Sequence, residues 1–322
     1  MEISIRRGKL NDLSQVVELI GELAENTYGI KSPLTVYDLI KDGFSIHRFY
    51  KLFVATKNEK IIGFAIFYKS YSIYGRSLII EEVFVTKKYK KFGVGLSLFS
   101  KCLEYALKKK VKQIEWAYDE QFSSLKELYE RAGAKVLTDM NLVCVYKDNI
   151  NKSVKLPPTI KENTFTEIPI IRYFEPKDTK VVFSLFQKII STYNINSKIS
   201  EQDLINDGFS KRPKFTIFVL EIENQIVGFS LLYPAYSIAY GKGLNIQEMY
   251  IDEAYRNYGF GKAFVHFIIQ YAKKEHINKI SLLINKQDIQ SLQRANDFYG
   301  EIVKGKKIVR ITSEALNNFI NN

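Results

Sequence analysis

Cysteine and proline are scarce in this chain, and both shortages narrow its class. Its 322 residues include only two cysteines, Cys102 and Cys144, which do not form a C-x-x-C motif. Two cysteines are too few for the disulfide framework of a secreted domain, so we expect a reducing, cytoplasmic location. Seven prolines and 17 glycines, with 46% hydrophobic and 25% charged residues, exclude a disordered or low-complexity protein.

Long hydrophobic runs are absent as well. No apolar segment approaches the roughly 20 residues that cross a bilayer, so we expect no membrane partner. The opening segment, MEISIRRGKLNDLSQVVELI, lacks the uninterrupted apolar core of a signal peptide. Its pattern instead predicts a strand followed by an amphipathic helix.

Concentrated basic arms are also missing, although the formal net charge is +12. The excess of Lys and Arg is divided evenly between the two halves of the chain. The clusters at 87–91 and 108–110 flank a predicted helix, and such runs are usually solvated faces. We therefore do not expect nucleic acid as the main partner, and we keep a basic binding module as the competing class.

The chain does contain a long internal repeat. The passage SLIIEEVFVTKKYKKFGVG (77–95) is answered by GLNIQEMYIDEAYRNYGFG (243–261), and DLIKDGF (38–44) by DLINDGF (203–209). The offset is 165 residues at Gly43 and Gly208 and 166 at Gly93 and Gly259. A period this long predicts two whole domains rather than a solenoid of small units.

Hydrophobic periodicity predicts the same element order in each copy: β, α, α, β, β, β, α, β, α, β, β. This order is typical of an α/β protein with a mixed sheet flanked by helices. We predict one domain over 1–148, a linker over 149–165 that contains Pro157 and Pro158, and a second domain over 166–322. An additional terminal helix is predicted at 313–319.

Each copy carries a G-x-G directly after a strand and at the start of a helix. Glycine allows the backbone to approach phosphate oxygens without a Cβ. The first amides of a helix have no intrahelical acceptor, and they lie at the positive end of its dipole. The two turns are therefore candidate phosphate cradles, with a tight strand-to-helix turn as the structural alternative.

With these motifs in view, both halves resemble the GNAT acetyltransferases. The first half is most similar to the diamine (spermidine/spermine) acetyltransferase branch, on the motifs DLIKDGF, HRFY, IIGFAIFY, LIIEEVFV, YKKFGVG and LYERAGA. The resemblance covers nearly all of 1–148 and most of 166–311. It implies two tandem GNAT domains and direct acetyl transfer from acetyl-coenzyme A, with no metal and no covalent intermediate.

The resemblance also implies where coenzyme A binds. The pyrophosphate loops are Lys90, Lys91, Phe92, Gly93, Val94 and Gly95 in the first half, and Arg256, Asn257, Tyr258, Gly259, Phe260 and Gly261 in the second. Lys90 departs from the family's commoner Arg or Gln and loses the planar fork of Arg. In this family the preceding strand has a bulge and parts from its parallel neighbour, which frees backbone groups for the pantetheine arm. Those groups belong to Val83, Phe84 and Val85, and to Met249, Tyr250 and Ile251.

The chemistry requires a proton acceptor for the attacking amine and a proton donor for the departing thiolate. Glu81 and Glu82 are the candidate bases in the first half; we favour Glu82, because the second half keeps it as Glu248 and replaces Glu81 by Gln247. By resemblance, Tyr129 is the proton donor. Its predicted counterpart in the second half is Tyr299, which lies four residues further from its loop.

The acceptor is predicted only as a primary amine on a small molecule, either diamine-like or amino-acid-like. Glu22, Glu25 and Tyr28 on the first helix could hold a polyamine, or they are ordinary surface residues. In one alternative, a single domain is catalytic and the other is structural or sensory. In another, the protein is a basic nucleic-acid- or protein-binding module with a regulatory acyl-coenzyme A site. A monomer and a homodimer both remain open, since the second domain could take the place of a partner subunit.

Overall fold

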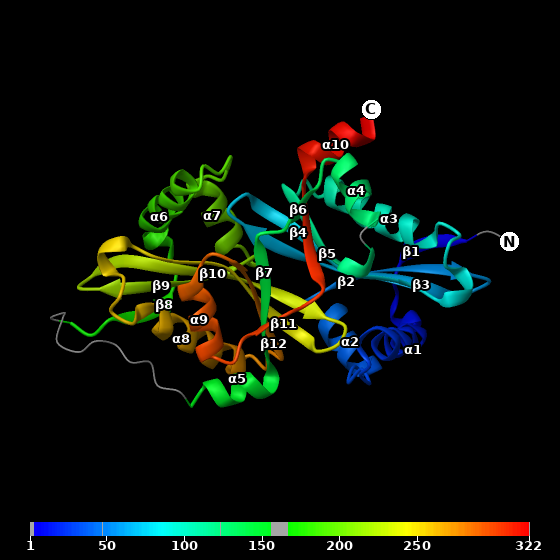
Figure 1. The fold of residues 1–322 in the computed structure, drawn as a ribbon, viewed down its shortest axis with the longest axis horizontal. Coiled ribbons are helices and arrows are strands. Elements are labelled where there is room, and N and C mark those ends of the chain that lie inside the picture. The colour runs from blue at the N-terminus through cyan, green and yellow to red at the C-terminus, as the bar shows by residue number, and fades with distance from the viewer. Residues whose placement is uncertain (1–2, 47, 123, 156–166, 322) are drawn as a thin grey trace.

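The computed structural model describes residues 3–46, 48–122, 124–155 and 167–321, and these form two mixed sheets of seven strands each. The two sheets lie next to each other with helices packed around them (Figure 1). The predicted fold class, two α/β domains with flanking helices, is confirmed.

Both halves contain the predicted elements in the predicted order. The first half consists of β1 (Ser4–Arg7), α1 (Leu13–Leu23), α2 (Val36–Gly43), β2 (Lys51–Lys57), β3 (Lys60–Ser72), β4 (Gly75–Val85), α3 (Val94–Lys108), β5 (Gln113–Asp119), α4 (Ser124–Arg131), β6 (Lys135–Leu137), β7 (Met140–Tyr146) and α5 (Lys147–Ser153). The second half consists of β8 (Ile170–Tyr173), α6 (Thr179–Thr192), α7 (Glu201–Gly208), β9 (Thr216–Ile222), β10 (Gln225–Ser237), β11 (Gly241–Ile251), α8 (Phe260–Lys274), β12 (Lys279–Asn285), α9 (Ile289–Asp297), β13 (Glu301–Ile302), β14 (Lys306–Thr312) and α10 (Ser313–Asn321).

Local sequence explains the turns and helix starts that the two halves share. The β2–β3 hairpin turns through Asn58 and Glu59, whose φ angles are 49° and 64°, as a type I′ turn requires. The helices α2 and α7 both begin with a capping box, in which Thr35 pairs with Asp38 and Ser200 pairs with Asp203.

The two halves exchange their last strands. The sheet order is β1-β2-β3-β4-β5-β14-β6 in one sheet and β13-β7-β12-β11-β10-β9-β8 in the other. The strand β7 of the first half therefore pairs with β12, while β14 of the second half pairs with β5. In Figure 1 the red C-terminal strand crosses beside β5 accordingly. Each sheet is completed by the other half of the chain.

The helices that follow the exchanged strands cross over with them. Ile150 of α5 belongs to the core of the second sheet, and Leu316 of α10 belongs to the core of the first. The start of the predicted linker, residues 149–153, is thus helical and packs on the second half, while residues 156–166 lie outside the described chain. The predicted domain limits, 1–148 and 166–322, follow the sequence repeat. The sheets do not follow these limits, because β7 and β14 each belong to the sheet of the opposite half.

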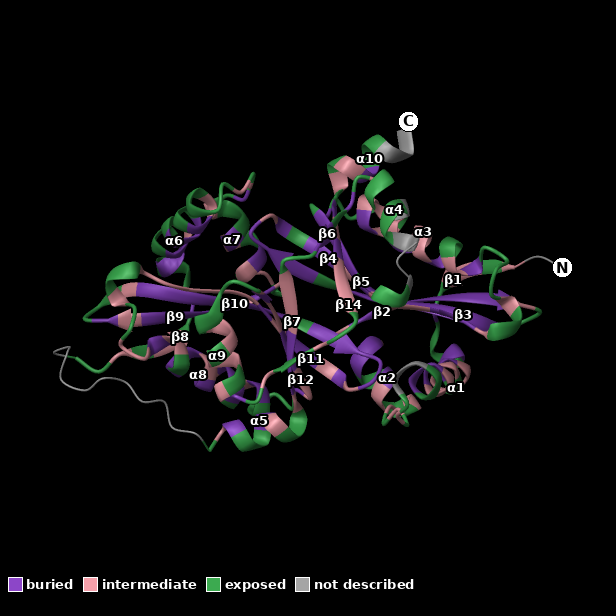
Figure 2. Ribbon diagram, viewed as in Figure 1, coloured by how far each residue is buried: buried purple, intermediate pink, exposed green. Residues whose placement is uncertain are grey.

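A continuous hydrophobic core joins the two halves, as the buried segments at the centre of Figure 2 indicate. Two matched aromatic contacts lie in it, both between tilted rings: the ring centroids of Tyr50 and Tyr236 are 4.5 Å apart, and those of Tyr71 and Phe215 are 4.4 Å apart. The residue pairs are related by the repeat, so the halves pack with approximate two-fold symmetry.

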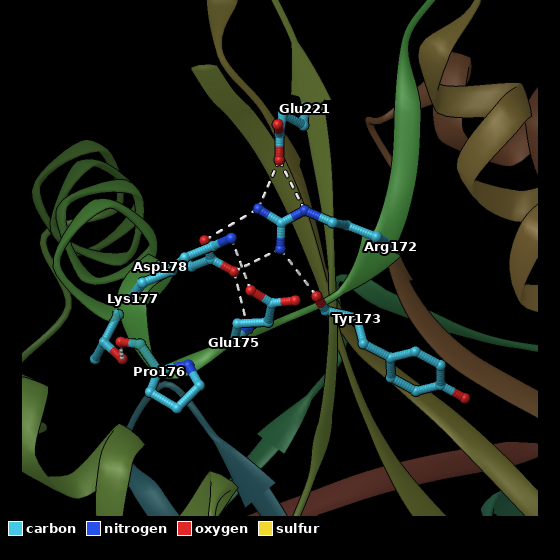
Figure 3. A network of polar contacts seen from close by, with 8 residues as sticks. Arg172, Tyr173, Glu175, Pro176, Lys177, Asp178 and Glu221 are labelled. Atoms are coloured by element: carbon cyan, nitrogen blue, oxygen red, sulfur yellow. Dashed lines mark hydrogen bonds and ion pairs between the residues drawn. The ribbon is translucent and has the colours of Figure 1, made fainter. Parts of the chain in front are cut away.

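A repeated arginine network fixes the outer strand of each sheet to the next helix. Arg172 donates hydrogen bonds to Asp178, Glu221 and the carbonyl of Tyr173 (Figure 3). In the first half, Arg6 donates to both carboxylate oxygens of Asp12 at 2.7 and 2.8 Å. These hydrogen bonds lower the pKa of Asp12. The network therefore has a structural role in both halves.

Candidate active site

Each sheet contains one parallel strand pair that parts halfway along its length. The pairing of β4 with β5 runs from Ser77 and Gln113 to Ile80 and Trp116 and then ends. The pairing of β11 with β12 ends at the matching point, Ile246 and Leu282. The segments 81–85 and 247–251 therefore border a gap in their sheets.

A β-bulge marks the point where each gap opens. On β4, Ile80 and Glu82 pair with the consecutive residues Phe67 and Ile66, so Glu81 is the additional residue. On β11, the additional residue is Gln247. The bulge and the parting of the strands, which the resemblance implied, are both present.

The first glycine turn is open. Gly93 is the N-cap of α3 with φ of +75°, no side chain caps the helix, and a Cβ added at Gly93 would meet nothing within 4 Å. Lys90, Lys91 and Phe92 are exposed beside it. The first amides of α3 have no intrahelical acceptors. The turn thus fits a phosphate group held by backbone amides and surrounded by lysines.

The second glycine turn has the same backbone, but a side chain approaches its second glycine more closely than in the first half, where a Cβ added at Gly95 would meet Val85 Cγ2 at 3.7 Å. Gly259 has φ of +94°, and Asn257 is left-handed like Lys91. A Cβ added at Gly261 would lie 3.0 Å from the guanidinium of Arg294, which comes from α9. Arg256, the loop's expected phosphate ligand, donates instead to the carbonyl of Ile251 at 3.0 Å.

A cavity of about 110 Å³ lies between the two sheets, at the points where both gaps open. Its lining comes in pairs related by the repeat, among them Tyr68 with Tyr233 and Glu81 with Gln247. The chemistry of the paired positions differs, because Glu115 in the first half corresponds to Ser281 in the second. The complete lining is Tyr68, Ile79, Ile80, Glu81, Glu115, Trp116, Ala117, Leu142, Tyr233, Asn245, Ile246, Gln247, Lys279, Ser281, Leu283 and Ile308.

Of the two candidate bases in the first half, Glu81 lines this cavity. The hydroxyl of Tyr68 donates to its Oε2 at 3.4 Å. Burial raises the pKa of Glu81, while Lys279 and Tyr68 act in the opposite direction. Glu82 pairs with Ile66 in the strand ladder and is half-buried. In the second half, burial raises the pKa of Glu248 to about 7.

Tyr129 lies on the other side of the first sheet from the cavity. Its ring makes edge contacts with Trp116 at 5.1 Å and Tyr118 at 5.7 Å. Tyr118 alternates along β5 with Ala117, which lines the cavity, and alternate strand residues face opposite sides. Trp116 borders the cavity as well, and it packs with Tyr118 and Tyr129 in the core cluster that contains Leu98 of α3. Burial raises the pKa of Tyr129, which keeps its hydroxyl protonated.

Tyr299 does not occupy the corresponding place in the second half. The helices α4 and α9 end in the same hydrogen-bond pattern: Ala134 N donates to Tyr129 O at 2.9 Å, and Gly300 N donates to Ala295 O at 2.8 Å. Tyr129 therefore corresponds to Ala295, and Tyr299 corresponds to the left-handed Gly133. Tyr299 is 43% exposed, and its ring lies 6.0 Å from the Nζ of Lys152 on α5.

The remaining predicted residues line the gap or lie apart from it. Phe84 and Val85 are buried and Val83 is half-buried, while Met249, Tyr250 and Ile251 are all half-buried. Glu25 is exposed and Glu22 is half-buried; the side chain of Tyr28 lies outside the described part. Among described residues, no cluster of His, Cys, Asp and Glu could hold a metal ion. The described helices are too short or too polar to span a membrane.

Sequence reasoning missed three site residues: Lys279, Tyr233 and Arg294. Lys279 and Tyr233 reach the cavity from the second half, and their contribution depends on how the two sheets pack. The signal available in the sequence was the repeat itself, because Tyr233 matches Tyr68 and Lys279 matches Gln113. Arg294 lies on α9, and its approach to Gly261 depends on how α9 packs against the turn.

A mixed sheet with a bulged, parted parallel pair and a glycine turn before the next helix defines an acyl-coenzyme A-dependent acyltransferase. The chain belongs to the acetyltransferase (GNAT) family, whose family model matches residues 16–134 and 183–301. It is an acetyltransferase, and enzymes of this family use acetyl-coenzyme A.

The relatives with known names each match less than half of this chain. The thialysine N-epsilon-acetyltransferase of Bos taurus is 29% identical over 147 residues, covering 42% of this chain and 86% of the relative. The L-ornithine N5-acetyltransferase of Arabidopsis thaliana is 23% identical over 132 residues, covering 41% and 54%. The spermidine/spermine N(1)-acetyltransferase-like protein 1 of Homo sapiens is 29% identical over 113 residues, covering 32% and 16%.

Two solved structures match almost the whole chain. A GCN5-related N-acetyltransferase from Sphaerobacter thermophilus aligns over 97% of this chain and 96% of its own, with a TM-score of 0.58 and 13% identity. A tandem GNAT protein from the clavulanic acid biosynthesis pathway aligns over 97% and 99%, with a TM-score of 0.54 and 10% identity. At these identities the likeness concerns the fold, and it supports the tandem arrangement.

Proposed function

We propose that this protein transfers the acetyl group of acetyl-coenzyme A to a primary amine of a small molecule, and that the first half carries out the reaction. The observation that carries the proposal is the first gap itself. An open glycine turn, a candidate acid and a candidate base are arranged around one parted strand pair. The names of the relatives, which refer to amines, support the acceptor class.

In the proposed reaction, the open turn at Gly93 and its lysines bind the phosphates of the donor. The backbone of Val83, Phe84 and Val85 pairs with the pantetheine arm, which places the thioester in the gap. Glu81, on the cavity side, accepts a proton from the attacking amine as the new C–N bond forms. Tyr129, on the opposite side, donates its proton to the thiolate as the C–S bond breaks. Both side chains then regain their starting protonation from solvent.

The second half is proposed as a structural partner that completes the site. Three features support this role: Arg294 approaches the second turn at Gly261, Arg256 is engaged by the Ile251 carbonyl, and Ala295 stands where Tyr129 stands in the first half. The exchanged strands give the half an indispensable part in the fold even without turnover.

The test is an acetyl-coenzyme A-dependent assay that follows release of the free thiol, with the acetylated amine identified by mass. Gly93→Ala adds a Cβ that points into the open cradle, so we expect the KM for acetyl-coenzyme A to rise at least about 10-fold. Gly259→Ala imposes comparable backbone strain in the second turn and serves as the control, with an unchanged KM. If Gly259→Ala raised the KM and Gly93→Ala did not, the second half would be the catalytic one. If the assay detects no acetylated small-molecule amine, the proposal is wrong.

A further inference from the structure

The cavity between the sheets is asymmetric in charge although its shape follows the repeat. Of the described residues that line it, Glu81, Glu115 and Lys279 carry charges. Glu115 is already neutralised, because Arg310 Nε donates to its Oε1 at 3.2 Å and the amide of Gln113 also donates to it. One carboxylate and one ammonium group therefore remain available to a ligand.

These two groups belong to opposite walls. Glu81 lies on β4 of the first sheet, and Lys279 lies at the start of β12 in the second sheet. Lys279 forms no ion pair with any described residue, although Glu81 lies close enough to influence it electrostatically. The cavity thus presents a negative group and a positive group to a molecule between them.

The repeat shows that Lys279 is not explained by local pairing on its own sheet. Its counterpart Gln113 bonds to Glu115, two residues further along the same strand. In the second half that position is the neutral Ser281, whose Oγ accepts from Asn245 Nδ2 at 3.3 Å. Strand β12 contains no carboxylate, so Lys279 is not needed to neutralise a charge on its own strand. The lysine instead places an ammonium group in the cavity wall, where no described residue forms an ion pair with it.

We propose that this cavity is the acceptor site, and that Lys279 of the second half selects acceptors in which a carboxylate accompanies the reactive amine. The inference rests on the proposed function and names its substrate class: a small diamino acid, rather than a diamine or polyamine. The amine lies toward Glu81, which accepts its proton, and the carboxylate lies toward Lys279. A diamine would instead bring a second ammonium group against Lys279 in a partly enclosed space. The second half is then a specificity-determining part of the first half's site.

Matched acceptors that differ by one carboxylate provide the test. Ornithine and putrescine form one such pair, and lysine and cadaverine form the other. In the wild-type protein we expect kcat/KM to be at least about 10-fold higher for each amino acid than for its diamine, the size of one charge-assisted contact. Preference for the diamines would overturn the inference.

Variants at 279 test the residue itself. Lys279→Gln should lower kcat/KM for ornithine about 10- to 100-fold and change that for putrescine by less than about 3-fold. Lys279→Glu should reverse the preference, which a general loss of folding cannot do. Lys274→Gln, an exposed lysine on α8, is the control and should change neither value. An unchanged preference in Lys279→Gln would contradict the assignment.

Binding measured without turnover separates this inference from the proposed function. Calorimetric titration of ornithine and putrescine, with coenzyme A present, should show tighter binding of ornithine that Lys279→Gln abolishes. If neither amine is acetylated but this binding pattern holds, the proposed function is wrong and the assignment of the cavity stands. Equal binding of the two amines would overturn the inference, whatever the turnover.

Discussion

Arg76 Nε donates to both carboxylate oxygens of Asp207, at 2.9 Å each, and so connects β4 of the first half to α7 of the second. The side chain of Asp207 is only 3% exposed. The repeat places a second, looser pair at the matching position, where Lys242 Nζ lies 3.8 Å from Asp42 Oδ1. The two pairs join the halves around the same approximate two-fold axis.

The difference between these pairs predicts unequal costs of removing the cation. Arg76→Met leaves the buried Asp207 carboxylate without its guanidinium; since the Arg76 side chain is itself 55% exposed, we expect a loss of about 2–3 kcal/mol in the free energy of unfolding. Lys242→Met removes a longer contact to a point charge and should cost less than about 1.5 kcal/mol. Urea unfolding at neutral pH measures both values. Equal losses would show that Arg76 holds the interface no more strongly than Lys242.

Tyr129→Phe tests the proposed proton donor. Removal of the hydroxyl should lower kcat about 10- to 100-fold and leave the KM for acetyl-coenzyme A unchanged, because the ring contacts with Trp116 and Tyr118 remain. Tyr299→Phe is the matched control, since Tyr299 occupies the position of Gly133, and its kcat should stay within about 2-fold. Steady-state kinetics with saturating amine measures kcat for both variants. A kcat unaffected by Tyr129→Phe would exclude its role.

Much of this fold could be read from the sequence, because the repeat and the alternation of apolar residues determine element order. The strand exchange could not. The strands β7 and β14 occupy matching places in the repeat, and each can satisfy its apolar pattern in either sheet. The choice depends on the short segments before them, 138–139 and 303–305, and on how the sheets pack.

The bulge explains why the favoured base differs between sequence and structure. In a regular strand, neighbouring residues face opposite sides, so the side of Glu81 or Glu82 follows from counting. An additional residue on β4 at Glu81 disrupts that count, and its position is set by pairing with β3. The sequence favoured Glu82, whereas the cavity favours Glu81 as the proposed base. Lys279 was missed for a related reason, because its role depends on contact between sheets.

Glu81→Gln tests this revised assignment. We expect kcat/KM for the amine to fall at least about 100-fold, with Glu82→Gln as the matched control losing less than about 5-fold. A base must be unprotonated to act, and burial raises the pKa of Glu81. Wild-type activity should therefore decline, as pH falls, at a pH above the usual carboxyl range, and Glu81→Gln should lose this limb. A pH–rate profile measures it; a limb retained in the variant would point to another group.

Glu248→Gln tests a pH effect on stability in the second half. Burial raises the pKa of Glu248 from 4.5 to about 7 in the folded protein. The folded state then binds more protons than the unfolded state between these two values, so Glu248 lowers the stability as pH rises through this window. The substitution removes that penalty and should stabilise the protein by about 3 kcal/mol at pH 8 but by almost nothing near pH 4.5. Glu275→Gln, on the exposed end of α8, should show no such pH-dependent gain in urea unfolding. Because the second half is proposed to be catalytically silent, turnover by Glu248→Gln should remain at the wild-type level; a large loss would instead indicate a second active site.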